Sequence, residues 1–142
     1  MSDLLDASVW VALTHADHVH HPRARRYWEN EALGPVAFCR ITALALLRHL
    51  TNRHIMHAGV LTGDAAWRTY RRWRALPSVV FLPDPADVET HLEHISRLVE
   101  LTPRLWTDAY LAAFTLAGGL RFVTFDHDFT RFDGLDLLLL EA

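Results

Sequence analysis

The stretch Leu4-Leu5-Asp6-Ala7-Ser8 constrains the fold more than any other, because it is a short apolar run that ends in a carboxylate. Residues 3–6 fit a buried parallel strand with Asp6 at its carboxyl end. In an open α/β sheet, ligands bind outside that end of the strands. A carboxylate buried there alone would be costly. We therefore expect Asp6 to share a cation with other acids, for which Asp108, Asp126 and Asp128 are the candidates.

Short apolar runs alternate with helical patterns along the rest of the chain. Further strands are predicted at residues 36–39, 79–82, 120–125 and, at an edge of the sheet, 135–140. Helices are predicted at residues 9–14 with Ser8 as N-cap, 22–33, 42–51, 65–76 with Asp64 as cap, 86–101 and 106–117. Residues 52–63 are interpreted as a loop. This order predicts an α/β fold, with a mostly parallel sheet of four to five strands, helices on both faces and a single domain over residues 1–142.

The predicted topology brings the acids to one place. Right-handed crossovers put the carboxyl ends of parallel strands at the same edge, where Asp6, Asp126 and Asp128 would meet. Asp108, in the first turn of a helix, can reach the same edge. Each acid also has a local explanation, either as a favourable charge at a helix start or as an acceptor in a turn. Clustered carboxylates repel one another, however, and a hard divalent cation relieves that repulsion. Mg²⁺ fits oxygen ligands, and Mn²⁺ is a plausible substitute.

Composition narrows the class of protein. No apolar run approaches the roughly 20 residues of a membrane span, and no secretory leader is apparent. Cys39 is the only cysteine, which excludes an internal disulfide and favours a reducing, cytoplasmic compartment. The net charge is -3 and the chain contains no lysine, so arginine supplies every permanent positive side chain. A site that requires a lysine is therefore excluded, and phosphate would be bound through guanidinium groups.

Two groups of polar residues have competing interpretations. Arg48 either lines the acidic cleft or extends from the core to solvent, while Arg68, Arg71 and Arg72 form either an RNA-binding face or a solvated one. Histidines recur at positions 15, 18, 20 and 21, and again at 91 and 94. Their spacing matches no tetrahedral zinc pattern, so we expect the first group to be solvated loop histidines and the second to be exposed or at the edge of the core.

Three motifs in this order, LLDAS, WTDAYLAAFTLAGG and LRFVTFDHDF, resemble the PIN domain, especially the VapC-type ribonuclease toxins of toxin–antitoxin pairs. The resemblance implies an α/β/α sandwich, Mg²⁺-dependent cleavage of RNA phosphodiesters, a cognate antitoxin and a homodimer. By motif, it assigns metal binding to Asp6, Asp108 and Asp126, with Asp128 as an auxiliary acid.

The chain departs from this family at one position. Family members carry a glutamate near the start of the helix after the second strand, where this chain has Ala43 and no acid between Glu31 and Asp64. A PIN fold that serves as a binding module, with little catalysis, is therefore an alternative.

Phosphoacceptor domains also cluster aspartates at strand ends. Receivers, however, need a lysine, and dehalogenase-like phosphatases need an acid at the position of Ser8.

Overall fold

The computed structural model describes residues 2–141, whose centre is a five-stranded, fully parallel sheet in the order β3-β2-β1-β4-β5. The strands are β1 (Asp3–Leu5), β2 (Val36–Phe38), β3 (Val79–Phe81), β4 (Arg121–Thr124) and β5 (Leu137–Leu139). The predicted parallel sheet is confirmed, and β5 lies at an edge as expected. Met1 and Ala142, the ends of the predicted domain, lie outside the described residues, so the single domain over 1–142 stays a prediction.

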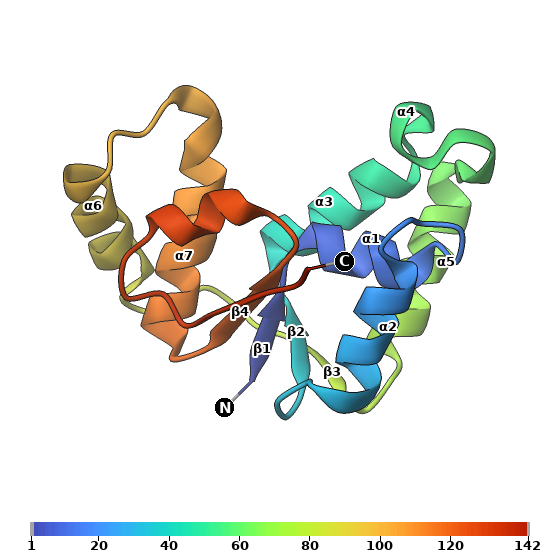
Figure 1. The fold of residues 1–142 in the computed structure, drawn as a ribbon, viewed down its shortest axis with the longest axis horizontal. Helices are drawn as coiled ribbons and strands as arrows, with labels where there is room; N and C mark the ends of the chain where they lie inside the picture. The colour runs from blue at the N-terminus through green and yellow to red at the C-terminus, as the bar shows by residue number, and fades with distance from the viewer. Residues whose placement is uncertain (1, 142) are drawn as a thin grey trace.

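Helices cover both faces of the sheet, as predicted. Figure 1 shows α1, α2, α3 and α5 on one side and α6 and α7 on the other. The helices are α1 (Ala7–Thr14), α2 (His21–Asn30), α3 (Arg40–Leu50), α4 (Arg53–Met56), α5 (Gly63–Arg74), α6 (Val88–Leu98) and α7 (Trp106–Gly118), with short 3-10 turns η1 (His57–Gly59), η2 (Pro103–Leu105) and η3 (His127–Arg131). Within residues 2–141, no helix has both the length and the apolar character that crossing a membrane requires.

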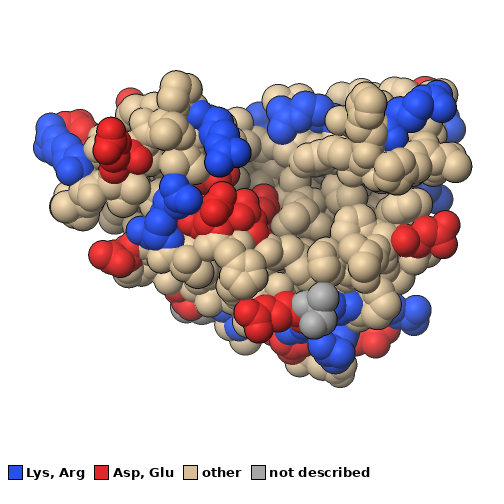
Figure 2. All heavy atoms as spheres, turned by 45° about the horizontal axis from the view of Figure 1, so that its top comes forward, with Lys and Arg blue, Asp and Glu red and all other residues tan. Residues whose placement is uncertain are grey.

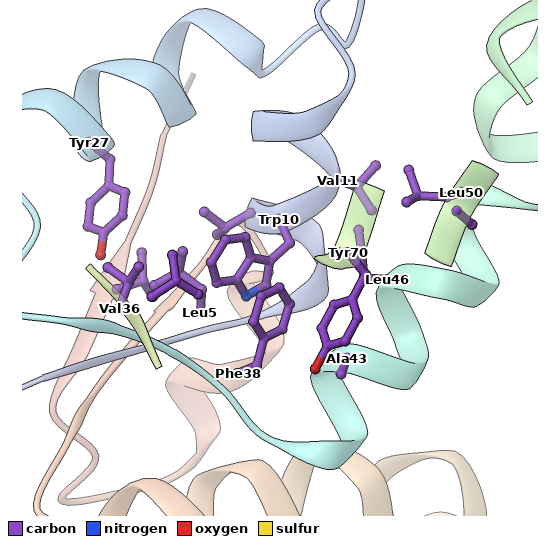
Figure 3. Close-up of a cluster of buried hydrophobic side chains, with 14 of the residues drawn as sticks. Leu5, Trp10, Val11, Tyr27, Val36, Phe38, Ala43, Leu46, Leu50 and Tyr70 are labelled. Carbon is purple, nitrogen blue, oxygen red and sulfur yellow. The ribbon is translucent and has the colours of Figure 1, made fainter. Parts of the chain in front are cut away.

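The alternation of side chains along β1 and β2 divides the core into two clusters. Leu5 and Phe38 face α1, α3 and α5, where Phe38 stacks on Trp10 with ring centroids 3.9 Å apart (Figure 3). Leu4, one residue away, faces α6 and α7 and packs in a cluster with Phe122. Because neighbouring strand residues point to opposite faces, two consecutive leucines anchor both layers. Full burial of each such side chain contributes about 1.5–3 kcal/mol.

A buried ion pair holds the amino ends of β1 and β4 together. Asp3 is fully buried and accepts two hydrogen bonds from Arg121, Nε to Oδ1 and Nη2 to Oδ2, both at 2.8 Å. The Tyr27 hydroxyl at 2.5 Å and the Leu33 backbone N–H at 3.1 Å also donate to Asp3 Oδ2. Burial and this carboxylate both raise the pKa of Tyr27. The charge at this end of the sheet is therefore neutralised within the protein.

Three local predictions were wrong. Helix α1 starts at Ala7, and its N-cap is Asp6 rather than Ser8, because the backbone of Asp6 is extended and its Oδ1 accepts from the Ala7 N–H at 2.8 Å. Helix α5 is capped by Thr62 instead of Asp64, through a 3.1 Å bond from the Ala65 N–H to Thr62 Oγ1. The predicted loop 52–63 contains α4 and η1.

Candidate active site at the carboxyl edge of the sheet

A cavity of about 530 Å³ opens at the carboxyl edge of the sheet, toward which the strands point in Figure 1. Asp6, Asp108 and Asp126 line it, together with side chains from α1, α3, α4 and the segment between α1 and α2. Figure 2 shows acidic side chains gathered in a hollow of this face, with basic side chains around it. The structure therefore brings together three of the four predicted acids, although they come from distant parts of the chain.

Asp6 directly follows β1 and is held by three hydrogen bonds. Its Oδ1 accepts from the Ala7 N–H at 2.8 Å, and its Oδ2 accepts from Thr124 Oγ1 at 2.7 Å and from Ser8 Oγ at 3.3 Å. Burial raises the pKa of Asp6, the three hydrogen bonds oppose that rise, and the charge of Asp126 adds to it. This carboxylate is thus oriented, but it remains electrostatically unfavourable.

Thr124 joins two of the acids, although no sequence pattern singles it out. Its hydroxyl donates to Asp6 and accepts a 2.9 Å bond from the backbone N–H of Asp126. Thr124 ends β4 and is fully buried. Asp126 in turn caps η3, since its Oδ1 accepts from the Asp128 N–H at 2.9 Å. The ends of β1 and β4 are therefore locked in one hydrogen-bonded chain.

Asp108 lies in the first turn of α7, on the opposite side of the cavity from α3. The pKa of Asp108 is raised to about 6, first by burial and then by the charges of Asp6, Asp126 and Asp128, while Arg131 lowers it. Like charges shift a carboxyl pKa in this way only over short distances. Asp108 therefore belongs to the same acidic group as the two strand-end aspartates.

Asp128 occupies a different position from the other acids. It is not among the residues that line the cavity, its side chain is half-exposed, and its Oδ1 is 3.4 Å from Arg131 Nη2. The Arg131 Nε–H also donates to the Asp128 carbonyl at 2.9 Å. Sequence reasoning overlooked Arg131, although a cation three residues after an acid in a short helical turn is a recognisable signal.

Of the four arginines predicted to bind RNA, one lines the acidic cavity and three lie on α5. Arg48 lines the cavity with the acids. Arg68 pairs with Asp64 on the exposed face of α5, and Arg71 lies over the Trp67 ring, 5.5 Å from its centroid. Arg72 lines a separate hollow. The three α5 arginines therefore do not adjoin the acidic cavity, and their role in RNA binding stays a prediction.

The expectation of solvated histidines was wrong for the segment between α1 and α2. His18 and His20 are partly buried and line the cavity, and the His20 ring stacks on Phe125 with centroids 4.6 Å apart. His49 of α3 lines the same cavity. Contacts between residues this far apart in the chain leave no trace in residue spacing. His91 and His94 are half-buried and exposed, respectively, as expected.

The position of the missing glutamate is part of the core. Ala43 is 1% exposed and packs in the cluster around Trp10 and Phe38, whereas its neighbours Thr42 and Leu44 line the cavity. Within the described chain, the ion pairs involve none of Asp6, Asp108 and Asp126. The acidic group therefore carries uncompensated negative charge beside an open cavity.

The donor set fits a hard divalent cation. All three carboxylates offer oxygen, the ligand type that Mg²⁺ and Mn²⁺ prefer. Among residues 2–141, no three acidic, histidine or cysteine side chains already form a group that could hold a metal ion. Mg²⁺ commonly keeps several waters and uses only one or two direct carboxylates, so its binding does not require a closed cage.

Comparisons with known proteins agree with this geometry. The PIN domain family model matches residues 4–135. Ribonuclease VapC41 of Mycobacterium tuberculosis is 39% identical over 96% of this chain and 97% of its own length. Two solved structures share the fold with TM-scores of 0.69 over 99% of this chain and 100% of theirs. They are M. tuberculosis VapC20, a sarcin-ricin loop cleaving toxin, at 21% identity, and Rickettsia felis VapBC2 bound to a DNA fragment from its promoter, at 12%.

The family match extends from β1 through β4, leaves out β5, and includes all three cavity acids. It decides between the PIN domain and the phosphoacceptor domains as explanations of the clustered aspartates. The chain belongs to the PIN-domain family and, within that family, to the VapC type.

Proposed function

We propose that this protein is a metal-dependent endoribonuclease, the toxin of a type II toxin–antitoxin pair. The observation that carries the proposal is the convergence of Asp6, Asp108 and Asp126 on one open cavity from β1, α7 and β4. These are the acids that the family motifs assign to the metal. The similarity to ribonuclease VapC41 supports the same reaction, hydrolysis of RNA phosphodiester bonds.

Asp6, Asp108 and Asp126 would hold Mg²⁺, with Mn²⁺ as a possible substitute. When bound, the ion acts as a Lewis acid toward the scissile phosphate and makes water a better nucleophile. The chain's own contribution is to orient the carboxylates, and Thr124 fixes the relative position of two of them. Asp128, beside the group, is the auxiliary acid that would orient the attacking water.

Two arginines reduce the repulsion between this acidic cavity and RNA. Arg48 lines the cavity, and Arg131 lies close enough to Asp108 to lower its pKa. Guanidinium groups bind phosphate oxygens through two parallel hydrogen bonds, which suits both to holding the RNA backbone near the acids. Arg68, Arg71 and Arg72 would extend that contact only for RNA long enough to reach α5.

An exposed apolar surface beside the cavity supports an antitoxin partner. Leu44 is 55% exposed, Ile55 37% and Trp67 46%, and Leu44 and Trp67 line a groove between α3 and α5. Large apolar side chains that lie exposed together commonly mark an interaction site. A partner seated there would cover the cavity that Leu44 and Ile55 also line. We further propose a homodimer and a cytoplasmic location, where RNA substrates are found.

The decisive experiment compares Asp6→Asn and Asp126→Asn with the wild type in a growth-arrest assay and in RNA cleavage with purified protein. Loss of both activities is expected, since asparagine keeps the size of the side chain but removes its charge. Asp64→Asn, an exposed acid on α5, is the matched control and retains activity. Cleavage that persists in excess EDTA would disprove the metal requirement.

A second function, a binding module with little catalysis, is favoured by one observation. Ala43 stands where the family has a glutamate, so the acidic group lacks a member. In that case Asp6→Asn and Asp126→Asn would leave growth arrest unchanged while the purified protein still bound RNA. The same pair of assays therefore separates the two functions.

A further inference from the structure

The cavity has room for a ligand larger than a metal ion, and its acids form only one part of the lining. Another part consists of the imidazoles of His18 and His20 and the ring of Phe125, with Val11 and Leu111 beside them. The volume of about 530 Å³ is far larger than a hydrated cation needs. We call His18, His20 and Phe125 the aromatic wall.

The aromatic wall adjoins the acids directly. The rings of His20 and Phe125 stack at 4.6 Å with an angle of 17° between their planes, and Phe125 is the residue before Asp126. Stacking fixes the orientation of both rings, so the wall offers a flat and rigid surface. Flat aromatic surfaces next to phosphate sites are used by many proteins to stack the bases of single-stranded RNA.

Hydrogen bonds fix the proton positions on these histidines. The His20 backbone N–H donates to His18 Nδ1 at 3.0 Å, which leaves the His18 proton on Nε2. The side chain of His21 anchors the segment, since its Nδ1–H donates to the Ala12 carbonyl at 2.7 Å. Within residues 2–141, His20 Nδ1 is buried without a hydrogen-bond partner. His20 therefore keeps one polar ring atom unpaired in the wall.

The surroundings of His18 disfavour its charged form, which makes this part of the wall a poor phosphate site. Burial lowers the pKa of His18, and the neighbouring His20, His15 and His21 lower it further. The titratable and charged residues from other elements that line the cavity with this segment are Asp6, Arg48, His49, Asp108 and Asp126. A neutral imidazole with an Nε2–H is a hydrogen-bond donor to a carbonyl oxygen or ring nitrogen, the acceptors that a nucleobase edge carries.

We infer that the aromatic wall binds one nucleobase of the RNA, next to the phosphate that is cleaved, and so contributes to the choice of cleavage site. This inference rests on the proposed ribonuclease function. The base stacks against the His20–Phe125 pair, and the Nε2–H of His18 donates to its edge. His18 and His20 are specificity residues here, and they take no part in the chemical step.

The test measures base binding separately from cleavage. The four ribonucleosides, which have no phosphate for the acids to repel, are titrated into the protein in EDTA, with D-ribose as the probe that lacks a base. Proton NMR of the aromatic region is expected to show shifts of the His20 and Phe125 rings with at least one nucleoside and none with ribose. His20→Ala and Phe125→Leu should each weaken binding about 5- to 150-fold, the range for losing one stacked base. His94→Ala, an exposed histidine on α6, should leave it unchanged.

The two hypotheses fail in different ways. If no nucleoside shifts the two rings, or if ribose shifts them equally, the base site is refuted even when the protein cleaves RNA. Nucleoside binding that His20→Ala and Phe125→Leu leave intact refutes it as well. If nucleosides bind as expected but RNA is not cleaved in Mg²⁺, the base site stands and only the proposed ribonuclease function falls. Circular dichroism of each variant verifies that it is folded.

Discussion

Replacing Arg121 with methionine should destabilise the protein more than any surface substitution. Arg121 is the only cation that pairs with Asp3 within residues 2–141, and its side chain is 16% exposed while that of Asp3 is 0% exposed. Removing one partner of a buried ion pair leaves a buried charge without compensation, which costs about 3–5 kcal/mol. Tyr27 and the Leu33 N–H would still donate to Asp3, so the lower half of that range is the better expectation.

The magnitude can be converted into a melting temperature. The entropy of unfolding at Tm is about 2.1 cal/mol/K per residue, or about 0.3 kcal/mol/K for 142 residues. A loss of about 3–4 kcal/mol therefore lowers Tm by about 10–13 °C. Arg25→Gln, which breaks an exposed ion pair with Glu29 one helical turn away, is the matched control and should cost less than about 1 kcal/mol.

Equilibrium unfolding in urea, followed by tryptophan fluorescence, provides the assay. The double variant Asp3→Asn/Arg121→Met should recover part of the loss, because it removes both charges and keeps an acceptor for Tyr27 and Leu33. If Arg121→Met costs no more than Arg25→Gln, the buried pair does not stabilise the amino end of the sheet, and the electrostatic interpretation is refuted.

Three further predictions concern the acidic cavity. Thr124→Val should reduce the stimulation of RNA cleavage by Mg²⁺, because it removes the hydrogen bond that orients Asp6. The same variant should lower the free energy of unfolding by about 1–3 kcal/mol. Unchanged Mg²⁺ dependence of cleavage would contradict this role of Thr124. In calorimetry, Mg²⁺ should raise the Tm of the wild type by mass action but not that of Asp126→Asn. Burial, followed by the charge of Arg48, lowers the pKa of His49 in the folded protein. As the pH falls, His49 is therefore protonated in the unfolded chain at a higher pH than in the folded protein. The stability of the wild type relative to His49→Gln should therefore decline below about pH 6.5 and be constant above it.

The sequence predicted the sheet and the place of the acids because both depend on local patterns. An apolar run such as that before Asp6 indicates a buried strand, and the rules for parallel sheets put the ends of such strands at one edge. The position of Asp108 followed from its place at the start of a helix. The resemblance to the PIN family was likewise visible in three local motifs, and the family match confirmed it.

The details that the sequence did not predict depend on contacts between distant residues. Both Asp6 and Ser8 are good N-caps, and only the extended backbone at Asp6 determines which of them starts α1. The stacking of His20 on Phe125 joins segments more than a hundred residues apart. Thr124 gains its role from one buried hydroxyl that lies between two acids. No periodicity or local preference encodes such pairings.

The two ends of β1 show why we propose a bound cation at only one of them. Asp3 and Asp6 bracket the same strand, and each lies beside β4. At the amino end, Arg121 of β4 neutralises Asp3 with two hydrogen bonds. At the carboxyl end, β4 ends in a hydroxyl, that of Thr124, and a further acid, Asp126, follows the strand. Negative charge therefore accumulates at the carboxyl end, whereas at the amino end it is neutralised. A fold that neutralises a buried aspartate at one edge, but concentrates like charges around a cavity at the other, supports the proposal that a cation binds in that cavity.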